Sequence, residues 1–428
     1  MTPTGTKPRW PTTNTFLQIA LLVSVAGFLG YYDGIRFIIP PAPLVLGLQV
    51  IVLLAALVLH RADLLTFRTG LVPLVLLATW ACLTVLWADS PETAGQRWLL
   101  IFAPGLLLAA LAAADAFPAR SFARLKWALV IITIASFVFS LSIYIFGEVI
   151  AVGELLRFRV VDLGGWTIGV FEGGRQYLDQ TIYIHRFSGF TSNPNSFALF
   201  AALATIMLCA TIGRPRDTRG YAMAGVFIVI LFILVISASR AALAMALAGI
   251  VVVTLLRLEQ RRLAQLCVFG VLALTCLLYL AAVLQSTGAG GKGAEVFEFR
   301  ERADIWRLAL SAIGNVWATG VGFGLTEEAV FAPLGVPSSG HSVPLSLLLE
   351  TGIPGLVLLL LTWFWPVFAL TRRDRPLDGT SIAIVALLIA LFVHQAIDSS
   401  VFRYHWAHFV FVYLIGASSQ LAARRENG

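Results

Sequence analysis

The chain has 428 residues, of which 59% are hydrophobic and only 12% are charged, and its mean hydropathy is +0.87. Soluble domains carry about 25% charged residues, so this composition excludes an ordinary soluble protein and indicates an integral membrane protein. The net charge of +7 does not indicate nucleic-acid binding, because most basic residues form short clusters between apolar runs, as topology signals do.

Twelve apolar runs are long enough to cross a bilayer as helices, which takes about 20 residues each. We therefore predict an all-α integral membrane protein with about 12 transmembrane helices. The predicted spans are residues 15–32, 42–60, 70–88, 98–115, 126–146, 194–212, 220–237, 239–257, 263–284, 343–370, 380–398 and 404–421.

Lys and Arg residues occur in every second connection and at both termini. This pattern predicts an even number of spans with both termini in the cytoplasm, so that two large inserts lie outside. The resulting divisions are residues 1–146 with five spans, the first insert at 147–193, residues 194–284 with four spans, the second insert at 285–342, and residues 343–428 with three spans.

The second insert combines a helical segment, a glycine-rich turn and a histidine. Between Arg300 and Trp317 the apolar residues recur at three- and four-residue steps, with polar residues on the opposite face. This periodicity predicts an amphipathic helix on the membrane surface, forming a lid. The turn GVGFGL follows, without the strand and helix of a nucleotide-binding unit. His341 then stands at the start of the next span, where we place the hinge of the lid.

Two arginines stand at predicted outer ends of spans. Arg240 lies between two apolar runs, where insertion scales assign an arginine a cost of roughly 2.5–3.5 kcal/mol. Arg186 precedes Asn193 and Asn195, which are typical of a helix start whose free N–H groups bind anions. Both arginines are candidates for binding phosphate. The alternatives are a snorkelling side chain for Arg240 and an ordinary loop arginine for Arg186.

Histidines provide the other candidates. His341 is either an interfacial histidine or a functional base. A second polar group surrounds the last outer turn, but it contains no HExxH and no other three-ligand motif, so polar packing is favoured over a metal site. We predict no metal and no cofactor. This second group consists of His394, Asp398, Arg403, His405 and His408.

Four segments in this order, RFSGFTSNPN, SASRAALA, RADIWRLALSAI with GVGFG, and GHSVPLSLLLETGIPG, resemble the O-antigen ligase and polymerase superfamily, and within it the O-antigen ligases most. The resemblance implies a GT-C-like glycosyltransferase at the periplasmic face of a Gram-negative inner membrane. Its donor would be a polysaccharide on undecaprenyl diphosphate, and its acceptor a sugar hydroxyl of lipid A–core. The family's histidine falls on His341, and its arginines fall on Arg186, Arg240 and one of Arg300, Arg302 and Arg307.

The residue chemistry agrees with this implication. Arginine stays charged and binds phosphate oxygens bidentately, so arginines can stabilise a departing diphosphate without a metal ion. A histidine with an ordinary pKa of about 6.5 is mostly neutral at pH 7 and can accept the proton of an attacking hydroxyl. Attack from the face opposite the diphosphate would invert the anomeric centre.

Three other functions stay open. An O-antigen polymerase would use the same donor and a second lipid-linked glycan as acceptor, and a protein O-oligosaccharyltransferase would modify a protein. A secondary transporter or lipid flippase is the non-enzyme alternative. Transporters often contain internal repeats and charged midplane helices, whereas here the charges gather at the predicted outer boundary, which favours an enzyme.

Overall fold

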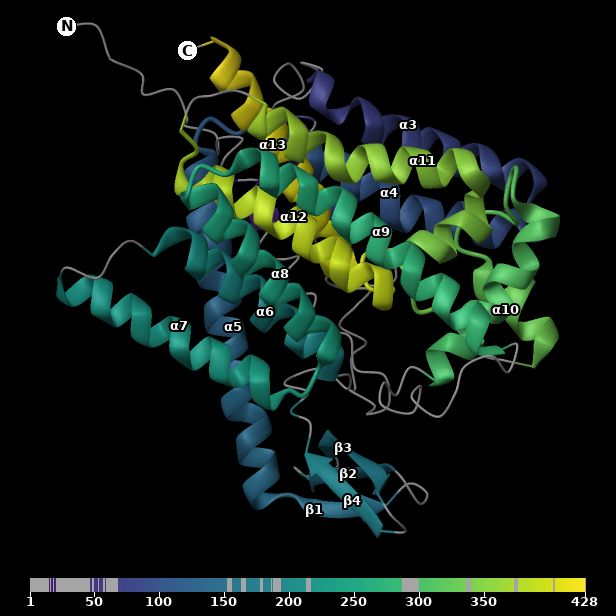
Figure 1. Ribbon diagram of the computed structural model, residues 1–428, viewed down its shortest axis with the longest axis horizontal. Helices are drawn as coiled ribbons and strands as arrows, with labels where there is room; N and C mark the ends of the chain where they lie inside the picture. The colour runs from purple at the N-terminus through teal and green to yellow at the C-terminus, as the bar shows by residue number, and fades with distance from the viewer. Residues whose placement is uncertain are drawn as a thin grey trace, which may run out of the picture.

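The computed structural model describes residues 68–151, 156–162, 167–177, 180–185, 187, 194–212, 217–286, 300–335, 340–372, 376–402 and 405–427, with scattered positions among residues 15–58. The chain in these ranges is mainly helical (Figure 1). Its α-helices are α3 (Val72–Leu83), α4 (Pro91–Ala113), α5 (Pro118–Phe146), α6 (Pro194–Thr211), α7 (Thr218–Ile236), α8 (Arg240–Arg257), α9 (Arg261–Ser286), α10 (Arg300–Val316), α11 (Val343–Thr371), α12 (Gly379–Ile397) and α13 (His405–Asn427).

The predicted spans can be compared with these helices. Among the described residues, eight helical segments are long and apolar enough to cross a membrane, and each overlaps a predicted span. Helices α7 and α13 occupy two further predicted spans. The predicted spans at 15–32 and 42–60 fall largely outside the described residues, so the total of twelve stays a prediction.

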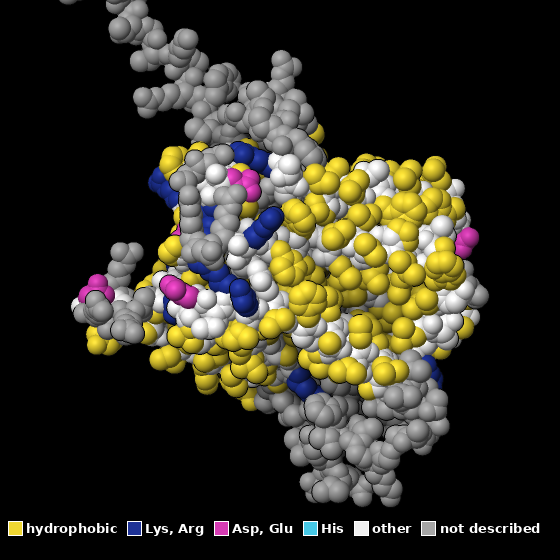
Figure 2. All heavy atoms as spheres, turned by 45° about the horizontal axis from the view of Figure 1, so that its top comes forward, with side chains coloured by type: hydrophobic (Ala, Val, Ile, Leu, Met, Phe, Trp, Pro, Cys, Tyr) yellow, Lys and Arg dark blue, Asp and Glu magenta, His cyan; other side chains and the backbone are white. Residues whose placement is uncertain are grey.

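Helices α6 and α12 form the centre of the bundle. Almost every residue from Phe197 to Leu208 and from Ile382 to Phe392 is buried, which is typical of helices that are apolar on all sides. Helix α12 packs against α6, α8, α9, α11 and α13. The outer helices instead expose apolar side chains, and a broad hydrophobic surface results (Figure 2), as expected for contact with lipid.

Lys and Arg side chains gather at one end of the bundle, which we call the basic end (Figure 2). Here Lys126 of α5 donates to Thr211 at the end of α6 (3.0 Å), and Arg425 of α13 donates to the carbonyl of Leu370 in α11 (3.1 Å). The side chains of Lys126 and Arg425 thus lie at this end, as predicted, whereas several of the other predicted basic connections fall outside the described residues. The compartment that this end faces stays a prediction. We call the opposite end, where α6, α8, α11 and α13 begin, the site end.

The first insert contains a β-sheet, which corrects the all-α prediction for this part of the chain. Its antiparallel strands lie in the order β1-β2-β3-β4, beyond the tip of α5 (Figure 1). The insert is rich in Val, Ile and Thr, which favour strands because branched side chains fit a pleated surface. The strands are β1 (Glu148–Ala151), β2 (Leu156–Asp162), β3 (Thr167–Tyr177) and β4 (Gln180–His185).

Helix α11 is broken near its start. Gly352 has φ 70° and ψ −172°, so the chain leaves the helical conformation there. Pro354 lacks an N–H, and the carbonyl of Glu350 therefore loses its helical donor. The backbone N–H of Gly322 donates to that carbonyl instead, at 2.9 Å. A bilayer offers no water to satisfy such groups, so protein must supply the partner.

The glycine-rich loop after α10 supplies these partners. The backbone N–H of Ile353 donates to the carbonyl of Trp317 (2.8 Å), and the N–H of Phe323 donates to the side chain of Thr84 (2.9 Å). A Cβ added at Gly320, which has φ 73°, would lie 2.2 Å from the backbone of Glu350. The glycines of this loop therefore permit close backbone packing against α11 and give no sign of a nucleotide site.

The predicted amphipathic helix is confirmed as α10. Its buried residues Ala303, Trp306 and Ala309 face protein, because α10 packs against α9 and α11. The apolar stripe is therefore covered by helices and does not need a lipid surface. Trp317 was predicted on this stripe but is 55% exposed, because the helix ends one residue earlier.

Replacement of Gly352 by alanine should destabilise the protein. The added Cβ would lie 2.5 Å from the backbone of Ala318, and a left-handed alanine costs about 1–3 kcal/mol. Gly270→Ala in α9 is the control, because a Cβ there meets no atom within 4 Å. Thermal unfolding of the detergent-purified proteins should show a lower midpoint for Gly352→Ala alone. Equal midpoints for the two variants would contradict the close packing of the break in α11 against the loop after α10.

Candidate functional site

Tyr279 of α9 contacts the start of α11, the end of α12 and the middle of α10 at the site end. The Tyr279 hydroxyl shares a short hydrogen bond with Ser342, immediately before α11, and donates to the carbonyl of Ala396 near the end of α12 (3.2 Å). Its ring packs against the ring of Trp306 in α10 in a T-shaped arrangement, with centroids 5.2 Å apart and planes at 76°. Tyr279 therefore fixes the start of α11 relative to α9, α10 and α12.

His341 lies in the turn that enters α11. Gly340 and His341 both have positive φ, 75° and 47°, and Ser342 then caps the helix by accepting a hydrogen bond from the N–H of Leu345 (3.4 Å). A left-handed conformation in a non-glycine residue costs about 1–3 kcal/mol and persists only where surrounding contacts impose it. The half-buried His341 is thus held in a strained and defined backbone conformation, as often occurs at functional sites.

The structure separates the three candidate arginines of α10. Arg302 donates to the carbonyl of Ile397 (2.7 Å) and lies 4.0 Å from the Asp398 carboxylate, so it ties α10 to the end of α12. Arg307 lies on the exposed face, 3.6 Å from Asp304. Arg300 is the first residue of the helix. Arg302 therefore binds the same end of α12 that Tyr279 contacts, whereas Arg307 points to solvent.

The remaining predicted residues lie at other helix starts. Arg240 is the exposed first residue of α8, after a turn in which Ala238 has φ 52°. Helix α8 packs along α12, and because the two helices run antiparallel, α8 begins near the end of α12 that binds Arg302. Asn195 is half-buried in the first turn of α6. Arg186 and Asn193 fall outside the described residues.

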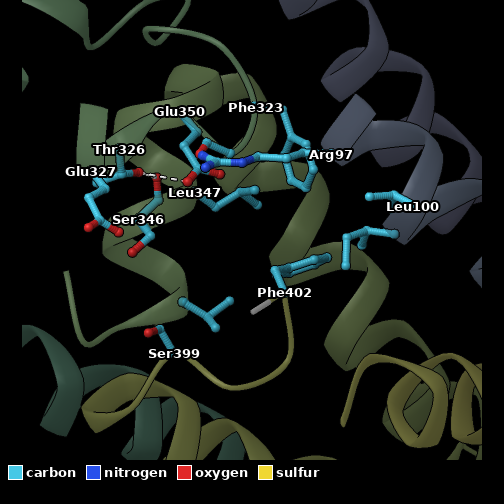
Figure 3. A pocket seen from close by; sticks show the side chains of 13 residues that line it. Arg97, Leu100, Phe323, Thr326, Glu327, Ser346, Leu347, Glu350, Ser399 and Phe402 are labelled. Carbon is cyan, nitrogen blue, oxygen red and sulfur yellow. Dashed lines mark hydrogen bonds between the residues drawn. The ribbon is translucent and has the colours of Figure 1, made fainter. Parts of the chain in front are cut away.

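A cavity of about 330 Å³ lies beside the His341 turn, and none of the predicted site residues that the structure describes lines it. Ser346 lines it, and a Cβ added at Gly340 would lie 2.7 Å from the Ser346 hydroxyl, so the turn borders the cavity. Figure 3 shows two kinds of wall. One is polar, with Glu327, Ser346 and a buried Glu350 that accepts a hydrogen bond from Thr326 (2.7 Å). The other is apolar and includes Phe402.

Arg97 of α4 fixes the segment that carries the polar wall. It donates to the carbonyl of Gly324 and to the carboxylate of Glu328 (3.0 Å) in η5 (Thr326–Phe331), a π-helical turn. Partial burial opposes ionisation of Glu328, but the hydrogen bond and charge of Arg97 outweigh it and lower the pKa of this carboxyl. The ion pair is therefore present at neutral pH, and its contribution is lost only as the pH falls through that lowered pKa.

Within the described part of the chain, no three His, Cys, Asp or Glu side chains converge as metal ligands would. Two of the histidines considered for a metal have other surroundings. The buried His394 lies 2.9 Å from the side-chain nitrogen of Gln395, and His408 packs among the rings of Phe102, Phe402 and Phe409. Arg403 falls outside the described residues. Metal-independent chemistry stays a prediction.

These observations define a class: a multi-span helical membrane protein whose strained histidine, arginines and polar cavity share one end. Residues 225–360 match the family model described as O-antigen ligase (Wzy_C). The match runs from α7 into α11 and includes Arg240, α10 and His341. This part of the chain is similar to the O-antigen ligase family, which confirms the predicted resemblance. No curated protein matched the chain.

Sequence reasoning missed Tyr279, Arg97, Glu327 and Glu350 as residues of this region. Glu350 carried a usable signal, because an acidic residue within the apolar run LLLETGIPG is expensive in a membrane and marks a polar site. Tyr279 carried none, since a tyrosine near the end of a span is ordinary. Arg97 directly precedes a predicted span and resembles a topology signal.

Removal of the Arg302 side chain should destabilise the protein, whereas removal of Arg307 should not. Arg302→Ala deletes a charged hydrogen bond to a half-buried carbonyl and leaves Asp398, 14% exposed, without this cation, at a cost of about 1.5–3 kcal/mol. Arg307→Ala is the matched control on the exposed face and should stay within about 0.5 kcal/mol of the wild type. Unfolding in detergent measures both. Equal stabilities would show that Arg302 does not anchor α10.

Proposed function

We propose that this protein is an O-antigen ligase. It transfers a polysaccharide from undecaprenyl diphosphate to a sugar hydroxyl of lipid A–core, at the periplasmic face of a bacterial inner membrane. The observation that carries the proposal is His341, held in a strained turn at the same end of the bundle as Arg302 and beside a cavity of about 330 Å³, within the residues that match the O-antigen ligase family. The proposed partners are the two lipids and the surrounding membrane, with no cofactor.

The proposed reaction is a direct displacement. The acceptor oxygen attacks the anomeric carbon, the bond from that carbon to the diphosphate breaks, and the proton of the acceptor hydroxyl passes to the His341 imidazole. Undecaprenyl diphosphate leaves with the bonding electron pair, and the configuration inverts. Because diphosphate is already a good leaving group, charge stabilisation by arginines replaces its protonation. Arginine suits this role since it stays charged and binds phosphate in a bidentate manner.

The cavity beside the turn supports a sugar acceptor. Its polar wall offers the Glu327 carboxylate and the Ser346 hydroxyl, which can hydrogen-bond sugar hydroxyls, and Phe402 offers an apolar face opposite. Its volume of about 330 Å³ lies in the usual range of ligand sites, roughly 300–1,000 Å³. A hydroxyl presented from this cavity meets the turn that carries His341.

The direct test combines purified protein, donor lipid and lipid A–core in the presence of EDTA and without nucleotide. Ligated product is expected, and its anomeric configuration should be inverted relative to the donor. Product that forms only with a second lipid-linked glycan would identify a polymerase, and product on a protein acceptor would identify an oligosaccharyltransferase. Strict dependence on a divalent ion would refute the metal-independent mechanism.

Loss of His341 should abolish ligation without loss of donor binding. A positioned base contributes about 10²–10⁴-fold in rate, so His341→Ala should fall by that factor. His341→Gln should fare little better, because an amide hydrogen-bonds a hydroxyl but does not accept its proton at neutral pH. Donor-lipid binding and monodispersity are measured on the same samples. A folded His341→Ala protein that ligates at the wild-type rate would end the general-base assignment.

Arg240 should contribute to donor binding. Its guanidinium and the positive end of the α8 helix dipole both favour an anion, so Arg240→Ala should lose donor affinity and activity together. Arg240→Lys should recover only part, since lysine keeps the charge but lacks the planar fork. Arg120→Ala, an exposed arginine in the first turn of α5 at the basic end, is the control. Full activity of Arg240→Ala would assign Arg240 to the membrane interface alone.

A further inference from the structure

A second cavity, of about 430 Å³, opens at the basic end, away from the His341 turn. It lies between the segment that precedes α3, the last turns of α11 and the end of α13. Two guanidinium groups line it, those of Arg68 and Arg372, and among the described residues one carboxylate does so, that of Glu426. The described part of the lining therefore carries an excess of positive charge.

Arg68 gives the strongest indication that the cavity takes a ligand. Its Nε is buried and finds no hydrogen-bond partner among the described residues. An unsatisfied N–H of a charged group removed from water is costly, so such groups are normally paired. The Ser418 hydroxyl also lines the cavity and donates to the carbonyl of Ile415 (2.6 Å), but its oxygen does not accept a hydrogen bond from the Nε of Arg68. The missing partner is an acceptor, and an anion fits best.

The surroundings indicate an anion that carries acyl chains. Trp365 lines the cavity and is 51% exposed, and Leu361, one turn before it on α11, is 46% exposed. Tryptophan favours the level of the lipid headgroups, and the apolar surface beyond it suits acyl chains. Basic pockets between transmembrane helices on the cytoplasmic side are known to suit anionic headgroups, and this end carries the predicted cytoplasmic charges.

We propose that this cavity binds the phosphate of an anionic phospholipid, with Arg68 and Arg372 as its ligands. The Nε of Arg68 then gains a phosphate oxygen as acceptor, and the hydroxyls of Thr69 and Ser419 line the space for a hydroxylated headgroup. The bound lipid joins the segment before α3 to α11 and α13. This inference does not depend on the proposed transfer reaction, since no residue of the His341 site takes part.

The test is lipid binding to the full-length protein in neutral detergent, measured by native mass spectrometry. The probes are phosphatidylglycerol, phosphatidylcholine and inorganic phosphate. The wild-type protein should retain phosphatidylglycerol in preference to phosphatidylcholine, and Arg68→Gln should weaken that binding by about tenfold or more, because a charged hydrogen bond is lost. Arg262→Gln removes an exposed arginine at the same end that does not line the cavity, and it should bind as the wild type does.

Several results would overturn the proposal. Equal retention of both phospholipids by the wild-type protein would do so without any variant. Equal losses in Arg68→Gln and Arg262→Gln would reduce the effect to general surface charge. Displacement of the lipid by millimolar inorganic phosphate would assign the cavity to a soluble anion. If Arg68→Gln does not fold, Arg372→Gln, at an exposed position of the same cavity, should show the same selective loss.

Discussion

The break in α11 is the constraint on which the site end depends. A helix that crosses a membrane satisfies its own backbone, and each interruption exposes polar groups that lipid does not solvate. Here the interruption at Gly352 and Pro354 is matched by the loop after α10, whose N–H groups reach the carbonyls of Leu349 and Glu350. The insert and the span therefore fold as one unit, and neither is complete alone.

This shared unit explains why the first turns of α11 are well defined. The start of the helix runs from Ser342 to Glu350. Its first residue contacts Tyr279, and its last residues accept hydrogen bonds from the glycine-rich loop after α10. His341 precedes this short fixed segment directly, so its backbone strain is supported on both sides. The polar wall of the cavity comes from the same segment and from η5, which follows the docked loop. One break thus positions both the histidine and the cavity.

The sequence predicted the periodic part of this structure well. Apolar runs of about 20 residues give helices almost regardless of context, and the buried face of α10 followed from its three- and four-residue steps. The sheet of the first insert was not predicted as strands, although its branched residues pointed there. The packing of GVGFG against α11 could not be predicted from the sequence either, because a glycine that permits positive φ does not indicate which backbone it will approach.

The candidate site was predicted in part for the same reason. His341 and the arginines stand out because polar residues at span ends are chemically conspicuous. Their relations are tertiary: nothing local distinguishes Arg302 from Arg307, which lie on the same helix. The difference arises because α12 ends beside Arg302. The Ile397 carbonyl accepts a hydrogen bond from Arg302, and the Asp398 carboxylate lies 4.0 Å from the same guanidinium. Only the packing of distant segments decides which arginine becomes an anchor.

These anchors bear on how a substrate would meet the site. Helix α10 is fixed by three buried side chains and by Arg302, and Trp306 contacts the same tyrosine that holds the His341 turn. A movement of α10 away from the bundle would break these contacts and release the turn, so a wide opening would disorder the residue that we propose as the base. Under the proposed function, such a site would gain its rate from a geometry that exists before the substrate binds, rather than from closure afterwards. The strained conformation of His341 is consistent with such a preorganised site, because the contacts that maintain it are already present without a substrate.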